Sequence, residues 1–81
     1  MMCIHKLIML MRREFDWLGG HHLDPAMRLM DDLQFDSVAL VHLQVAVEDH
    51  FGLRFHPLDD DLMEIFATVG SLAAAVDAKR E

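Results

Sequence analysis

The chain is poor in cysteine, in basic residues and in long apolar runs. A single cysteine, Cys3, excludes an internal disulfide framework and a cysteine-rich zinc module, so a reducing compartment, the cytoplasm, is the expected location. Seven Lys and Arg residues stand against fourteen Asp and Glu, and the net charge of -7 would repel nucleic acid.

The longest apolar run, residues 1–11, is interrupted by His5 and Lys6 and is too short to span a bilayer. No cleavage site follows it, so we expect it to belong to the mature fold, with neither a nucleic-acid nor a membrane partner.

Sequence motifs for catalysis or metal binding are also lacking. The six histidines are spread over at least four segments without a His-Glu-x-x-His pattern, so we expect no metal site. The two serines, Ser37 and Ser71, do not lie in a Gly-x-Ser-x-Gly motif. The sequence therefore predicts a protein that is not an enzyme.

What the chain does contain is apolar residues, 53% of the total, which recur at steps of three and four along several segments. This spacing is typical of amphipathic helices, and the length predicts one small domain, residues 1–81. The predicted elements are a helix over about 2–17, a long loop over 19–36, a helix over about 37–51, a short helix over about 60–66 and a last helix over about 69–79. We expect an all-α fold, a small four-helix bundle with three longer helices and one short helix.

The helix predicted over 37–51 has two apolar stripes. One consists of Leu40, Leu43, Val47 and Phe51, and the other of Val38, Val41 and Val45. Together they cover more of the helix circumference than a single core contact needs. The valine stripe either faces a partner or ligand, or belongs to the core.

Three blocks of sequence occur in a fixed order: residues 29–38 (LMDDLQFDSV), residues 48–52 (EDHFG) and residues 67–72 (ATVGSL). The first places an Asp-Ser pair at the start of a predicted helix, the second ends that helix, and the third opens the last helix. In this order the blocks resemble the acyl carrier proteins, small four-helix proteins that carry acyl groups on a phosphopantetheine arm. The resemblance covers roughly residues 23–76.

The resemblance implies that Ser37 is the attachment residue for 4'-phosphopantetheine, which a phosphopantetheinyl transferase would donate from coenzyme A. A phosphodiester at the first turn of a helix would lie near unpaired N–H groups and the positive end of the helix dipole. The reactive thiol would belong to the cofactor, so the protein needs no nucleophile of its own. By the same resemblance, the surface that partner enzymes recognise consists of Asp36, Val38, Val41, Val45, Glu48 and Asp49.

Three features depart from the family or point to a neighbouring one. Gln34 stands where the family usually has glycine, so a left-handed backbone there would be strained by the side chain. His42 replaces a residue that is commonly acidic, which favours a specialised pathway over the synthesis of housekeeping fatty acids. Residues 18–22 (LGGHH) look like the Leu-Gly-Gly-His-Ser attachment motif of peptidyl carriers, but His22 occupies the serine position.

The resulting hypothesis is a monomeric acyl carrier protein of specialised metabolism, loaded by an acyl-activating ligase and read by downstream acyl-processing enzymes. Two alternatives stay open. One is a stand-alone aminoacyl or peptidyl carrier served by an aminoacyl-activating ligase. The other, of a different class, is a helical interaction module that keeps the fold but is never modified.

Overall fold

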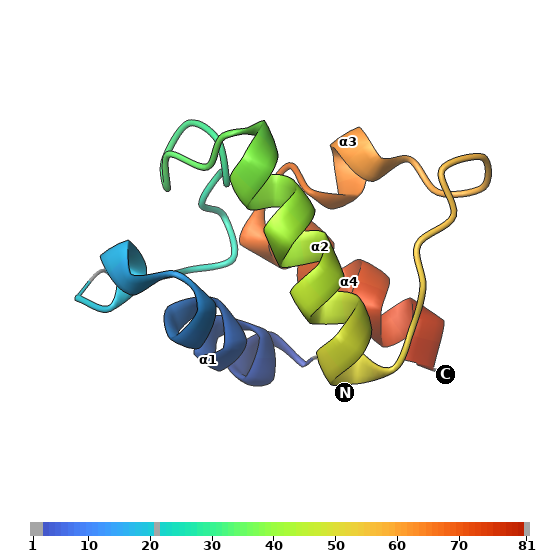
Figure 1. Ribbon diagram of the computed structural model, residues 1–81, viewed down its shortest axis with the longest axis horizontal. Coiled ribbons are helices and arrows are strands. Elements are labelled where there is room, and N and C mark those ends of the chain that lie inside the picture. The colour runs from blue at the N-terminus through green and yellow to red at the C-terminus, as the bar shows by residue number, and fades with distance from the viewer. Residues whose placement is uncertain (1–2, 21, 81) are drawn as a thin grey trace.

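The computed structural model describes residues 3–20 and 22–80, which form helices joined by loops (Figure 1). The elements are α1 (Ile4–Glu14), the 3-10 helix η1 (Asp16–Leu18), α2 (Ser37–Phe51), α3 (Leu62–Ile65) and α4 (Val69–Arg80). α1 packs against both α2 and α4, and α3 packs against α4. The fold is the expected all-α bundle of three longer helices and one short helix. Within the described residues, no helix has the length and apolar character needed to cross a membrane.

Helix α2 has the bounds predicted from the sequence, and both of its ends are capped. At the start, the Asp36 carboxylate accepts a hydrogen bond from the backbone N–H of Ala39 at 2.8 Å. At the end, Gly52 takes the left-handed conformation, with φ 66°, that commonly terminates a helix. Leu43 and Val47 are fully buried and fix the inner face of the helix. Local capping and core packing therefore agree on where α2 begins and ends.

The first helix is shorter than the predicted range of about 2–17. It ends at Glu14 because Phe15 is extended, with φ -130° and ψ 102°, and a 3-10 turn follows. The extended backbone places the ring of Phe15 in the core, where its centroid lies 4.8 Å from that of Phe35. Tertiary packing of this ring thus overrides the helical periodicity. Residues 1–2, at the start of the predicted range, lie outside the described residues.

The long loop, described at residues 19–20 and 22–36, is held against the start of α4 at Pro25 and Met27. The carbonyl of Pro25 accepts a hydrogen bond from the N–H of Gly70 at 2.8 Å, and that of Met27 accepts one from Val69 at 3.0 Å. A Cβ at position 70 would lie only 2.9 Å from the Pro25 oxygen, so this close approach requires glycine. The loop is therefore a fixed part of the fold that leads into α2.

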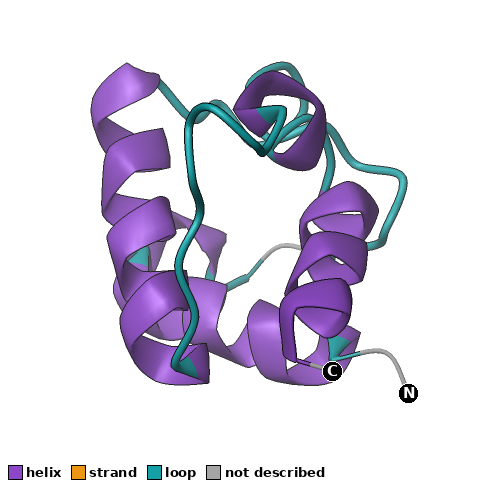
Figure 2. Cartoon of the chain, turned by 90° about the vertical axis from the view of Figure 1, so that its right-hand side faces the viewer, coloured by secondary structure: helices purple, strands orange, loops and turns teal. Residues whose placement is uncertain are grey.

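The loop between α2 and α3 runs along one side of the molecule (Figure 2). Its Phe55 is buried, and its Asp60 forms an ion pair of 2.9 Å with Lys79 of α4. The Lys79 ammonium also lies 5.6 Å from the centroid of the Phe55 ring. These contacts anchor the loop to α4. Beyond it, α3 and α4 begin and end within two residues of their predicted bounds.

Candidate functional site

Ser37 is the first residue of α2 and is exposed to solvent. The preceding Asp36 satisfies the N–H of Ala39, but the first turn of a helix leaves further N–H groups without a partner inside the helix. These groups and the helix dipole give the start of α2 a partial positive charge. A phosphate ester on Ser37 would therefore lie where the backbone favours an anion, and the residues present fit such a group.

The second serine, Ser71, has a different environment. Its hydroxyl donates to the carbonyl oxygen of Ile65 at 2.8 Å and accepts the backbone N–H of Thr68 at 3.0 Å. The Ser71 N–H in turn donates to the Thr68 hydroxyl at 2.9 Å, which caps the start of α4. Ser71 is partly buried and its hydroxyl stabilises the start of α4, whereas Ser37 is an exposed residue.

The segment that leads into α2 is held by specific contacts. The N–H of Phe35 donates to the carbonyl of Leu29 at 2.9 Å, and the indole N–H of Trp17 donates to the carbonyl of Leu33 at 3.1 Å. Between these contacts, Gln34 is left-handed, with φ 63°. The strain expected from a side chain at this position is therefore present in the fold.

The valine stripe of α2 lies on the surface. Val38 is 76% exposed, Val41 61% and Val45 50%. The interpretation of these residues as core is therefore wrong, since Leu43 and Val47 fill that role. Three exposed valines on one helix face form an apolar patch that the other described residues leave largely uncovered. Such a patch is suited to contact with another molecule.

The three acids assigned to the same surface differ in their environments. Asp36 and Asp49 are exposed, whereas Glu48 is partly buried. The Glu48 carboxylate accepts the backbone N–H of Phe55 at 2.9 Å and so ties the end of α2 to the following loop. Sequence reasoning gave Glu48 only a partner-binding role and missed this structural one, because the contact depends on how the loop folds back.

His42 is an exposed residue of α2 that contacts α1. Its Nε2 is 3.0 Å from an oxygen of the Glu14 carboxylate, and its ring centroid is 4.8 Å from that of Phe15. The hydrogen bond from His42 is the main reason that the pKa of Glu14 is lowered. The histidine that departs from the family pattern is thus paired with an acid of α1.

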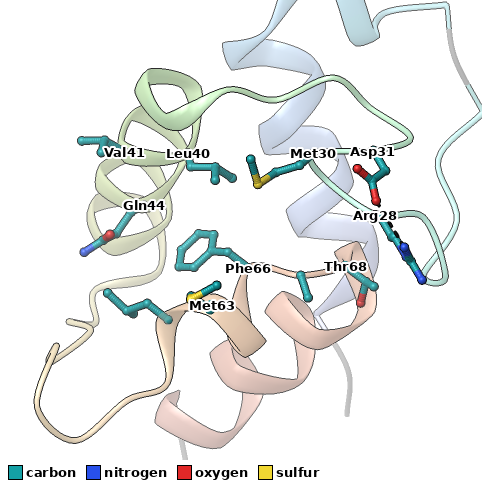
Figure 3. Close-up of a pocket in the computed structure, with 11 residues that line it drawn as sticks. Arg28, Met30, Asp31, Leu40, Val41, Gln44, Met63, Phe66 and Thr68 are labelled. Carbon is teal, nitrogen blue, oxygen red and sulfur yellow. Dashed lines mark hydrogen bonds and ion pairs between the residues drawn. The ribbon is translucent and has the colours of Figure 1, made fainter.

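A groove of about 740 Å³ opens beside α2, between α3 and the loop residues 28–31. Met30, Leu40 and Phe66 point toward one another across it (Figure 3). At one end, Arg28 and Asp31 form an ion pair of 3.2 Å. The sequence gave no signal for this groove, because three separate segments of the chain meet there only after folding.

Comparison with known proteins decides the family. Residues 5–76 match the family described as "Phosphopantetheine attachment site". The chain belongs to this family of carrier proteins. A stretch of 52 residues is also 44% identical to a protein named "Acyl carrier protein MbtL" from Mycobacterium sp. (strain MCS). The match covers 64% of this chain and 55% of that relative, so the chain spans about half the length of the relative it matches.

Family membership fixes the general role of this carrier. The family is one of carriers and not of catalysts, and membership implies a 4'-phosphopantetheine prosthetic group on this chain. Carrier proteins are modified by phosphopantetheinyl transferases and interact with the enzymes of their pathway. When bound, the prosthetic group supplies the thiol on which cargo is held as a thioester. The protein's own contribution is to fix the position and surroundings of the attachment residue.

The carrier's own thiol lies away from the surface. Cys3 is buried, and its sulfur lies 3.6 Å from the carbonyl oxygen of Ala73. Burial raises the pKa of Cys3, with Asp77 as a second cause, so the thiol stays in its neutral and less reactive form.

In the segment that looks like a peptidyl-carrier motif, residues 18–22, Leu18 is the last residue of η1 and Gly19 follows as its C-cap. His21 lies outside the described residues, and His22 is exposed, with its Nε2 4.0 Å from the carboxylate of Asp24. The residues that follow, 23–36, contain no helix. The helix start that would accompany an attachment serine is therefore at Ser37 and not at position 22.

Proposed function

We propose that this carrier holds acyl intermediates on 4'-phosphopantetheine attached to Ser37 and presents them to the enzymes of a specialised pathway. The observation that carries the proposal is the exposed position of Ser37 at the capped start of α2, within the segment that matches the family. The other serine, Ser71, is engaged in capping α4. In loading, the Ser37 hydroxyl oxygen forms the new bond to phosphorus, and adenosine 3',5'-bisphosphate leaves coenzyme A.

The decisive experiment is intact-mass measurement after incubation with coenzyme A and a broad-specificity phosphopantetheinyl transferase. We expect the wild-type protein to gain one prosthetic group and Ser37→Ala to gain none. Ser71→Ala is the matched control, since it removes the other serine hydroxyl, and it should still be loaded while its circular dichroism reports the native fold. If the wild type stays unmodified with several transferases, the protein is an unmodified helical interaction module and the proposal is wrong.

The proposed partner surface consists of Asp36, Val38, Val41, Val45, Glu48 and Asp49. Support comes from the exposure of the three valines and from the carboxylates at both ends of the stripe. An apolar stripe flanked by acids suits an enzyme surface that pairs apolar side chains with Arg or Lys. The transferase, the activating ligase and the downstream acyl-processing enzymes are the expected partners of this surface. We expect the carrier to act as a cytoplasmic monomer.

Two observations favour acyl cargo over aminoacyl cargo. The relative is named an acyl carrier protein, and the groove beside α2 has a mainly apolar lining that includes Met30, Leu40 and Phe66. Methionine side chains are flexible, so such a groove can adapt to alkyl chains of different shape. The test is to offer the loaded carrier adenylating ligases with fatty acids or with amino acids and to identify the cargo by mass. Transfer of amino acids alone would support the aminoacyl carrier.

A further inference from the structure

The peptide group between Leu33 and Gln34 is held in a strained orientation. Gln34 has φ 63°, a conformation that costs a residue with a Cβ atom free energy and persists only where the surroundings enforce it. The least disruptive way to relieve it is to rotate this one peptide group, because the rotation changes only ψ of Leu33 and φ of Gln34. Two common β-turn types differ by such a rotation. Some contact must therefore oppose it.

The indole N–H of Trp17 makes that contact. It donates to the carbonyl oxygen of Leu33 at 3.1 Å, and this oxygen belongs to the peptide group that would rotate. Rotation would swing the oxygen away from the indole and break the bond. The Trp17 hydrogen bond is therefore available only while Gln34 stays left-handed, and it offsets part of the strain.

Trp17 is itself well placed to act as a fixed donor. Its ring centroid lies 5.1 Å from that of Phe15 and 5.5 Å from that of Phe35, and both phenylalanines are buried. These edge and tilted contacts favour the observed orientation of the indole. The same Phe35 follows Gln34 in the chain and comes two residues before Ser37. A rotation at Gln34 would therefore disturb the segment that sets how Ser37 is presented.

We propose that Trp17 is a positioning residue for prosthetic-group attachment, holding the Leu33–Gln34 peptide so that the chain enters α2 with Ser37 in the orientation the transferase requires. This inference rests on the proposed function, in that Ser37 is the residue loaded. Trp17 acts through the loop and does not take part in the chemistry. Its exposed fraction of 47% leaves one competing explanation, direct contact of the indole with the transferase, which the test separates.

The test uses Trp17→Phe, which keeps an aromatic ring beside Phe15 and Phe35 but removes the N–H donor. We expect kcat/KM for loading by the transferase to fall roughly two- to tenfold, the equilibrium factor that one hydrogen bond is worth. The scalar coupling between the amide and α protons of Gln34, measured by NMR, depends on φ and should shift as the rotated peptide becomes populated. Circular dichroism and Tm report whether the variant is folded.

The rescue variant is Trp17→Phe combined with Gln34→Gly. Glycine adopts positive φ without a steric cost, so the peptide should return to its native orientation and loading to near the wild-type rate. Gln34→Gly alone should load like the wild type. No comparable rescue is expected if the indole contacts the transferase directly, because glycine at position 34 does not restore the indole.

Two results would overturn the role of Trp17. One is a Trp17→Phe variant with wild-type kcat/KM and an unchanged Gln34 coupling. The other is a slowed variant that Gln34→Gly fails to rescue, which would assign Trp17 to direct transferase contact or general packing. Both leave attachment at Ser37 intact, because fragment mass analysis locates the prosthetic group independently. Loss of loading in the wild type, by contrast, would refute the proposed function itself.

Discussion

Replacing Gln34 by glycine should stabilise the carrier, although glycine substitutions usually destabilise folded proteins. Gln34 is exposed and left-handed, so the change removes backbone strain at a position where no core packing is lost. The opposite change is available at Gly52, which has nearly the same φ, 66°. A Cβ at that position would meet no atom within 4 Å, so Gly52→Ala adds strain without a steric clash.

The two effects that compete at Gln34 can be weighed. A left-handed backbone costs a residue with a Cβ atom about 1–2 kcal/mol, and the extra freedom of glycine in the unfolded chain costs about 0.4–1 kcal/mol. The midpoints of the two ranges differ by about 0.8 kcal/mol, and we expect Gln34→Gly to raise the free energy of unfolding by roughly this amount. For a domain of this size, that corresponds to a rise in Tm of about 2–8 °C. Gly52→Ala should lower the free energy of unfolding by a similar amount.

Thermal and urea unfolding, followed by circular dichroism, measure both changes. Gln34→Ala is the matched control, because it removes the side chain beyond Cβ but keeps the strained backbone, and its Tm should stay close to that of the wild type. A Gln34→Gly variant that is no more stable than Gln34→Ala would refute the reasoning. In that case the left-handed conformation would carry no measurable strain.

Acid should weaken the fold, and a charge change on α2 should slow loading. The pKa of Glu14 is lowered chiefly by the hydrogen bond from His42, and that of Asp60 chiefly by the backbone N–H of His56. Each carboxylate therefore binds protons less readily in the folded state, so its stabilising contribution is present above the ordinary pKa and is lost as pH falls through the lowered value. The free energy of unfolding of Glu14→Gln, measured with urea across this acidic range, should depend less steeply on pH than that of the wild type. An equal slope of this free energy against pH would contradict the prediction. Asp49→Lys should slow loading several-fold at low ionic strength and reduce its salt dependence, whereas Asp59→Lys, the same charge change in the loop after α2, should have less effect. Equal effects of the two substitutions on the loading rate would show that Asp49 does not belong to the partner surface.

Glu48 is less suitable than Asp49 for a charge-reversal test of the partner surface. Its carboxylate accepts the backbone N–H of Phe55, so reversing its charge would disturb the loop as well as the surface. Slower loading by such a variant would not identify a partner contact. The salt dependence of Asp49→Lys avoids this ambiguity because Asp49 is exposed.

The parts of the fold that could be predicted from the sequence are those fixed by local chemistry. The bounds of α2 follow from an N-cap at Asp36 and a glycine at position 52, and both signals lie within a turn of the helix ends. The end of α1 could not be predicted, because the extended backbone of Phe15 reflects packing against Phe35, which is distant in sequence. Contacts between distant residues override local periodicity at such points.

The same distinction holds at the site. The position of Ser37 at a helix start follows from residue types and their neighbours, whereas the strain at Gln34 could be expected only through the resemblance to carriers that have glycine there. The bond of Trp17 to the Leu33 carbonyl could not be expected, since it joins residues on different segments of the folded chain. The groove beside α2 likewise depends on segments that meet only in three dimensions.

The close approach of Gly70 to Pro25 has a practical consequence for anyone who shortens this protein. The loop that leads into Ser37 is positioned by its contact with α4, although Pro25 and Gly70 are separated by about half of the chain in sequence. A synthetic peptide excised around the serine would contain the acceptor hydroxyl and its flanking residues but not the surface that gives them form. Such a fragment should be a poor substitute for the whole carrier as a substrate for modification.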